Sequence, residues 1–154
     1  MSELKVRRDP PRRFLGLAGV IHRDDVAERM GELVAHFSEV STGVPHLGRQ
    51  VALYHPQGSD PFGPDGEPCW LGRELTATSD APPGLQLNWI PGGDVAVLVH
   101  EGPHEKMLET HFALHGMVQA LGRKLVGPNW EIYVSMSDDP NQLRTEVCYL
   151  LESA

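Results

Sequence analysis

The sequence predicts an α+β fold in which two βαββ units form one antiparallel sheet, with two long helices on one face and a ligand groove on the other. The order strand–helix–strand–strand is predicted twice, over residues 12–77 and again over 94–151. Each helical stretch carries an apolar stripe, as expected of a helix that covers a sheet. The 154 residues suffice for one domain with a sizeable core.

The first half begins with a basic segment and continues as one βαββ unit. Residues 1–13 are polar and basic, with four arginines around Pro10-Pro11, and residues 1–11 are predicted to form a flexible lead-in. Asp24 or Asp25 then caps a helix that extends to about Val40. The strands predicted around this helix cover residues 14–22, 51–55 and 69–77.

The second half repeats this plan after a linker. Residues 78–84 contain two consecutive prolines and predict the connection between the halves. Gly102-Pro103 opens a helix to about Leu121, because proline is tolerated in the first helical turn. Residues 85–90 are expected to be extended, and strands are predicted over 94–100, 130–136 and 144–151.

Composition excludes several classes of protein. The net charge is −8 and the pI is near 5.4, which argues against direct nucleic-acid binding, because phosphate neutralisation needs a basic face. An acidic surface can instead attract cationic ligands or a DNA-binding protein partner. Cys69 and Cys148 predict buried thiols in a reducing cytoplasm. No membrane segment is expected, and the absence of phosphate-binding and dinucleotide motifs predicts no cofactor.

The histidines of the second half raise the question of a metal site. His100 to His104 match the H-E-x-x-H pattern, but Gly102-Pro103 prevents the helical turn that this zinc motif requires. His104, His111 and His115 share one flank of the second predicted helix. No acidic residue is obviously placed to complete a metal shell, so we expect half-buried packing and no metal.

The segment Trp130-Glu131-Ile132-Tyr133-Val134 contains the main candidate site residue. Strand alternation places Trp130, Ile132 and Val134 toward the helix-covered core, and Glu131 and Tyr133 toward the groove. An unpartnered carboxylate among aromatic residues is expected to have a raised pKa. The alternative is that Glu131 pairs with an arginine, for which Arg144 and Arg73 are the candidates.

Other large aromatic residues could reach the same groove. Tyr54 occupies the equivalent strand of the first half. A carboxylate with tyrosine and tryptophan neighbours suits an apolar cation, through charge pairing and cation–π contact. The predicted ligand-binding residues are therefore Glu131, Tyr54, Tyr133, Trp89, Trp70 and Tyr149.

Several segments resemble the GyrI-like domain, which is also the effector-binding domain of AraC-type and multidrug-responsive activators. They are Leu53–Pro56, Pro91–Pro103, Trp130–Tyr133 and Leu143–Tyr149, and the resemblance covers about 12–151. It implies two βαββ units around a ligand groove, with Glu131 as the family's groove glutamate and Tyr54 and Tyr133 as groove aromatics. His104 and His111 stand where many relatives have aromatic residues. The chain has no space for a helix-turn-helix domain before the first strand, so it resembles a stand-alone member.

Three functions follow from this resemblance. The first is binding of an amphipathic, cationic small molecule. The second is hydrolysis of reactive cyclopropane-type compounds, with Glu131 as the catalytic general base. The third is an acidic inhibitor that binds a protein such as DNA gyrase.

Overall fold

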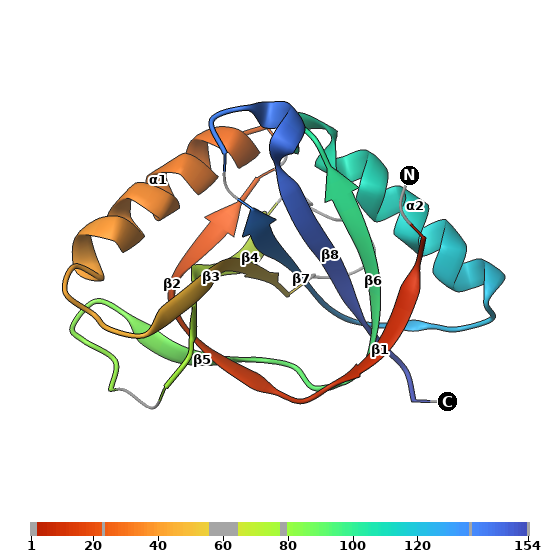
Figure 1. Cartoon of the computed structure of the whole chain (residues 1–154), viewed down its shortest axis with the longest axis horizontal. Coiled ribbons are helices and arrows are strands. Elements are labelled where there is room, and N and C mark those ends of the chain that lie inside the picture. Colours follow the sequence, from red (N-terminus) through yellow and green to blue (C-terminus); the bar gives the residue numbers. More distant parts are fainter. Residues whose placement is uncertain (1–2, 23, 56–64, 78–79, 136, 154) are drawn as a thin grey trace. The chain divides into compact units, whose positions relative to one another are not determined.

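The computed structural model describes residues 3–22, 24–55, 65–77, 80–135 and 137–153. They fall into two compact units (Figure 1). One consists of Arg12–Ile90 and is called the 12–90 unit below. The other consists of Pro91–Ala154 together with Met1–Pro11 and is called the 91–154 unit.

The 91–154 unit is a four-stranded antiparallel sheet with one long helix. The strand order is β1-β6-β8-β7, and α2 packs against β6. Its elements are β1 (Lys5–Asp9), β6 (Gly93–Glu101), the 3-10 helix η1 (His104–Lys106), α2 (Met107–Ala120), β7 (Leu125–Ser135), the 3-10 helix η2 (Pro140–Gln142) and β8 (Arg144–Leu151).

The 12–90 unit has the same plan. Its strands pair in the antiparallel order β5-β2-β4-β3, and α1 packs against β2 and β4. Its elements are β2 (Arg12–Ile21), α1 (Val26–Val40), β3 (Leu47–Tyr54), β4 (Glu67–Leu75) and β5 (Gln86–Ile90). The predicted α+β class with antiparallel pairing is confirmed, and each βαββ sequence gains one edge strand.

The edge strands change two predictions. The segment 1–11 was expected to be a flexible lead-in, but Lys5–Asp9 forms β1 and pairs with β6. The segment 78–84 was expected to connect the halves, but β5 follows it and pairs with β2, so the 12–90 unit ends at Ile90. Residues 78 and 79 lie outside the described residues.

Ion pairs join the basic N-terminal segment to acidic residues of β6 and β8. Arg7 lies 3.4 Å from the Glu146 carboxylate of β8 and 3.1 Å from Asp9. Burial opposes the charge of Arg7, but these carboxylates outweigh it and raise the pKa of Arg7. Arg8 lies 3.1 Å from Asp94 of β6. The arginines that suggest a solvated arm in the sequence therefore belong to a strand and form ion pairs with residues of β6 and β8.

A buried apolar cluster joins α2 to the sheet of the 91–154 unit. Leu98 of β6 and Val147 of β8 are cross-strand partners, and Leu114 of α2 packs in the same cluster. The cluster consists of Ala96, Leu98, Met107, Leu114, Val118, Val147, Tyr149 and Leu151. It identifies the α2-facing side of this sheet.

The two cysteines and the two long helices also bear on expectations from the sequence. Cys69 and Cys148 are both buried, and no disulfide joins them, as the sequence predicts. In the described part of the chain, neither helix has the length and apolarity needed to span a bilayer.

Candidate functional site

Strand β7 places Glu131 beneath helix α2. Glu131 is the cross-strand partner of Val147, which belongs to the apolar cluster under α2. Partners in an antiparallel pair share a face, so Glu131 and Tyr133 lie on the helix-covered side. Trp130 and Ile132 lie on the opposite side and are fully buried. The predicted assignment of the two faces of β7 is therefore wrong: Glu131 and Tyr133, not Trp130 and Ile132, face the helix. Alternation along a strand separates two faces but does not show which of them a helix covers.

The carboxylate of Glu131 is buried and hydrogen-bonded at both oxygens. Only 7% of Glu131 is exposed. Its Oε2 atom lies 2.8 Å from His111 Nε2, and its Oε1 atom accepts a 2.7 Å hydrogen bond from the Tyr133 hydroxyl. On the far side of the imidazole, His111 Nδ1 lies 2.7 Å from the Tyr149 hydroxyl. The four side chains form one hydrogen-bonded chain, Tyr149–His111–Glu131–Tyr133.

These partners determine the charge of Glu131. Burial acts to raise the pKa of Glu131, but hydrogen bonds from His111 and Tyr133, with the charges of His111 and His104, outweigh it and lower the pKa. Glu131 is therefore ionised at neutral pH and accepts the Nε2–H of His111. The sequence predicted a raised pKa, which is wrong because His111 supplies the partner that the prediction lacked.

The two arginines considered as partners of Glu131 are engaged elsewhere. Arg144 lies 3.4 Å from the Glu101 carboxylate, and Arg73 Nε donates a 2.7 Å hydrogen bond to the Gly48 carbonyl oxygen. The carboxylate of Glu131 has the His111 imidazole, not an arginine, as a hydrogen-bond partner.

Aromatic rings and one hydroxyl surround this hydrogen-bonded chain. The His104 ring lies 5.5 Å from the Tyr133 ring, and the His115 ring meets the Tyr149 ring edge-on at 4.7 Å, between ring centroids. Thr145 is the cross-strand partner of Tyr133, and its buried hydroxyl has no hydrogen-bond partner among the described residues. The surroundings of Glu131 thus combine aromatic surface with an unsatisfied polar group.

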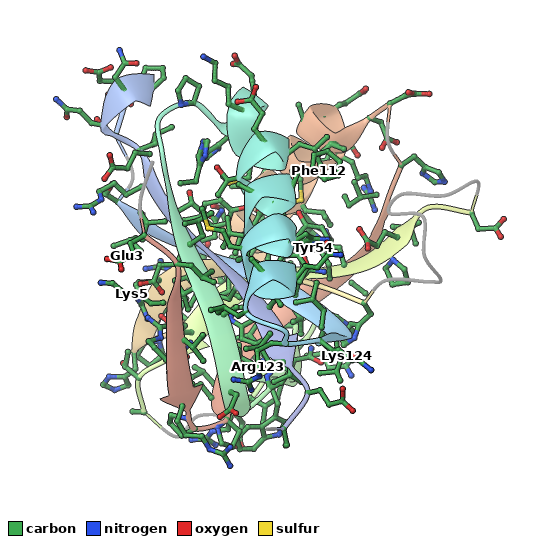
Figure 2. All side chains as sticks on the ribbon, turned by 90° about the vertical axis from the view of Figure 1, so that its right-hand side faces the viewer. Glu3, Lys5, Tyr54, Phe112, Arg123 and Lys124 are labelled. Atoms are coloured by element: carbon green, nitrogen blue, oxygen red, sulfur yellow. The ribbon has the colours of Figure 1, made fainter. Side chains whose placement is uncertain are left out.

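Large apolar side chains are exposed on α2 beside the histidines. Phe112 is 63% exposed and Leu108 is 53% exposed. They are four residues apart, so they are neighbours on the helix surface. Figure 2 shows α2 in front of β6, with Phe112 labelled beside the helix. Phe112 directly follows His111 in α2, so the same helix carries both a hydrogen-bond partner of Glu131 and this exposed apolar surface.

The H-E-x-x-H pattern does not form a metal site. His100 ends β6 and is buried, where its Nε2 atom donates a 2.8 Å hydrogen bond to the Pro103 carbonyl oxygen. Its Nδ1 atom lies 2.6 Å from the Thr110 hydroxyl, while His104 begins η1. Across the described ranges, no three His, Cys, Asp or Glu side chains are grouped so that they could hold a metal ion.

The remaining predicted ligand residues lie in the 12–90 unit and do not gather there. Tyr54 is buried, and its hydroxyl lies 3.9 Å from Met30 Sδ of α1. Its cross-strand partner is Cys69, so the next residue, Trp70, lies on the other face of the sheet. Trp89 is 56% exposed and is the cross-strand partner of Arg13 in β2. Tyr54 and Gly19 share the cross-strand partner Cys69, and Gly19 lies about 20 Å along β2 from Arg13, so Trp89 is far from Tyr54.

The 12–90 unit has a concavity of its own beside the end of β2. Its volume is about 440 Å³. It is lined by Ala18, Gly19, Val20, Arg29, Pro68, Cys69 and Trp70. Trp70 lines this concavity, and none of the described lining residues carries a carboxylate.

His111 is the site residue that the sequence prediction missed. Its spacing places it on the same helix flank as His104 and His115, but the sequence assigns no acidic partner to it. The signal was present, since His111 follows the buried Thr110 and precedes Leu114 at the margin of the apolar stripe. The residue spacing does not show that β7 passes beneath this edge of α2 and brings Glu131 to His111.

The partial burial of His115 predicts an acid-sensitive contribution to stability. Burial, and to a lesser extent the neighbouring His111, lowers the pKa of His115 below 6.5. The unfolded chain therefore binds this proton first, and His115 reduces stability as the pH falls below about 6.5. Urea unfolding at pH 7.5 and 5.5 is expected to show a smaller acid-induced loss in His115→Gln than in the wild type. An equal loss in both proteins would contradict this assignment, and His36→Gln on α1 is the matched control.

Comparison with known proteins identifies the fold and no family. No family model and no curated protein matches the sequence. Among solved structures, the C-terminal domain of EcmrR gives a TM-score of 0.82 at 13% identity, over 100% of this chain and 99% of that one. EcmrR in its complex with DNA gives 0.81 at 15% identity, over 99% of this chain and 58% of that one.

Two further structures differ in the molecules or activities associated with them. SAV2435 bound to tetraphenylphosphonium gives a TM-score of 0.69 at 12% identity, over 97% of this chain and 94% of that one. A hydrolase encoded by lin2189 from Listeria innocua gives 0.65 at 13% identity, over 98% of this chain and 92% of that one. At these identities the likeness establishes the fold alone, which this chain shares with the C-terminal domain of EcmrR.

Proposed function

We propose that this chain is a small-molecule-binding module of the GyrI-like kind, which binds lipophilic cations beside Glu131. In this proposal its two βαββ units are related by a pseudo-twofold axis within one sheet. One observation carries the proposal: Glu131 is a buried, ionised carboxylate whose partners are an imidazole and a phenol. With one proton on the imidazole, the Glu131–His111 pair has a net charge of −1.

A buried charge of this kind attracts a counter-ion. No arginine or lysine of the described ranges forms an ion pair with Glu131. The partners of this carboxylate are hydrogen-bond donors rather than an arginine or a lysine, so its negative charge can still attract a cation, and charge–charge attraction is strong in a low-dielectric environment. The protein's net charge of −8 adds a weaker, long-range attraction for cations.

The hydrogen bonds at Glu131 select the type of cation. Both carboxylate oxygens already accept a hydrogen bond, from His111 and from Tyr133. A phosphonium or quaternary ammonium ion needs no hydrogen-bond acceptor, whereas a primary ammonium ion would compete with these donors. The rings of Tyr133, Tyr149 and the exposed Phe112 supply aromatic surface for such an ion.

The structural comparisons support this choice of ligand. SAV2435, which shares the fold, was solved with tetraphenylphosphonium bound. The C-terminal domain of EcmrR has the same fold over the full length of this chain. A bound lipophilic cation in one protein of this fold makes the same class of ligand a reasonable first probe here.

Titration with tetraphenylphosphonium at pH 8 tests the proposal. We expect saturable binding with one ligand per chain in isothermal titration calorimetry. The neutral compound triphenylphosphine oxide has similar aryl groups, and we expect it to bind at least about tenfold more weakly, which corresponds to about 1.4 kcal/mol of charge pairing. No saturable binding of the cation, or equal affinity for the two compounds, would contradict the proposal.

A hydrolase is the second candidate, because Tyr149, His111 and Glu131 form a chain of acid–base groups. The fold likeness to the Listeria innocua hydrolase is compatible with it. The lowered pKa of Glu131 weakens this carboxylate as a general base, which favours binding over catalysis. Mass analysis after incubation with reactive cyclopropane compounds would reveal addition of water, and its absence across a panel would count against hydrolysis.

A further inference from the structure

We propose that His111 sets the charge of the Glu131 site and thereby determines whether the site accepts a cationic or a neutral ligand. The inference rests on the proposed function, because it concerns the same site. The imidazole lies between two oxygen atoms, Glu131 Oε2 at 2.8 Å and Tyr149 Oη at 2.7 Å. Any proton that His111 gains or loses therefore changes the charge directly beside the buried carboxylate.

Both protonation states of His111 preserve the same two hydrogen bonds. With one ring proton on Nε2, the imidazole donates to Glu131 and accepts from the Tyr149 hydroxyl at Nδ1. With two ring protons, Nδ1 donates instead and the Tyr149 oxygen accepts, because a hydroxyl can do either. The net charge of the Glu131–His111 pair changes from −1 to 0 while its heavy atoms keep their places. The site can thus exchange one ligand class for another without a conformational change.

Other titratable groups face His111 from each neighbouring element. Tyr133 and Glu131 come from β7, and Tyr149 comes from β8. His104 of η1 contacts the Tyr133 ring and its charge also acts on Glu131, whereas His115 of α2 contacts the Tyr149 ring. A proton on either of these two histidines would also add positive charge nearby, so the test has to separate them from His111.

The test compares two ligands across pH. Affinities of tetraphenylphosphonium and triphenylphosphine oxide are measured by calorimetry from pH 5.5 to 8.5. In the wild type, we expect the Kd of the cation to rise on acidification, because a second proton on the imidazole would cancel the negative charge of the pair. The Kd of the neutral compound is expected to stay constant or to fall. A cation Kd that does not change with pH would overturn the inference.

Two variants assign the effect to one histidine. Gln in His111→Gln can donate an amide N–H to Glu131 but cannot gain a proton, so the Kd of the cation should vary less than about twofold across the range. His115→Gln removes a histidine that contacts the Tyr149 ring but not Glu131, and should retain the wild-type pH dependence. Retained dependence in His111→Gln, or lost dependence in His115→Gln, would overturn the assignment.

A measurement on the wild type avoids reliance on variants that fail to fold. If binding of the cation favours the singly protonated imidazole, binding at pH 6 must release protons, up to about one per ligand. Calorimetry in buffers of different ionisation enthalpy measures this release, and the neutral compound should release none. Equal release by both compounds would overturn the inference. Failure of both compounds to bind at every pH would instead remove the proposed function, and this inference with it.

Discussion

Replacing Glu131 with glutamine is expected to weaken binding of tetraphenylphosphonium at pH 8 by at least about tenfold. The substitution removes one negative charge and keeps the shape of the side chain. The amide oxygen can still accept from Tyr133, and the amide N–H₂ group can donate to His111 Nε2 once the imidazole proton moves to Nδ1. Binding of triphenylphosphine oxide should therefore change little, because the apolar surroundings persist.

Two control variants separate a local charge effect from a general one. Glu101→Gln removes the same charge from an exposed position of β6 that pairs with Arg144, and should change cation affinity by less than about twofold. Tyr133→Phe removes a hydrogen bond to Glu131 while leaving its charge, and should weaken cation binding less than Glu131→Gln does. If Glu101→Gln weakened binding as strongly as Glu131→Gln, the attraction would belong to the whole acidic surface.

Glu131→Gln should also change how the free energy of unfolding depends on pH under acidic conditions. The pKa of Glu131 in the folded chain is lowered from 4.5, since the hydrogen bonds and charges around it outweigh its burial. Its ionised form therefore adds stability that is present above about pH 4.5 and is lost as the pH falls through the folded-state value. Urea unfolding below pH 4.5 should consequently depend less on pH in Glu131→Gln than in the wild type.

Gly72→Ala is expected to cost at least about 3 kcal/mol of folding stability. Gly72 lies in β4 and is the cross-strand partner of both Gly16 and Val51. A Cβ atom at this position would collide with the carbonyl oxygen of Leu15 and lie 2.7 Å from the Gly16 Cα. These are backbone atoms of a paired strand, so relief requires β2 and β4 to separate. Urea unfolding measures the loss.

Gly31→Ala provides the matched control in the same unit. Gly31 lies in α1, and beyond its chain neighbours and the nearby helix backbone no described atom lies within 4 Å of a Cβ placed there. Alanine is the better helix former, so this variant should gain about 0.5–1 kcal/mol. If the two variants unfolded within about 1 kcal/mol of each other, the proposed tight contact between β2 and β4 would be wrong.

The order of helices and strands was predictable because each carries its own local signal. Asp25 occupies the N-cap position of α1 as the sequence predicts, although its side chain makes no capping hydrogen bond, and Gly102-Pro103 precedes η1 and α2. Strand β1 has no such signal, because Lys5–Asp9 is polar and its stability comes from pairing with β6. Pairing between segments more than eighty residues apart depends on the tertiary fold, and residue spacing does not report it.

The candidate site was predictable in part for a related reason. The alternation around Glu131 correctly separates it and Tyr133 from Trp130, since the pleat of a strand is local. Which side of the sheet α2 covers depends on packing, and the predicted side was the wrong one. His111 follows the same logic: its place on the flank of α2 is visible in the sequence, but its contact with β7 is not.

The most direct measurement of the central claim is the position of the bound cation. Nuclear Overhauser effects between the phenyl protons of tetraphenylphosphonium and assigned side chains would report it in solution. We expect contacts with the rings of Tyr133, Tyr149 and Phe112, beside the Glu131 carboxylate. Contacts confined to Val20 and Trp70, which line the separate concavity of the 12–90 unit, would contradict the assignment of Glu131 as the cation site.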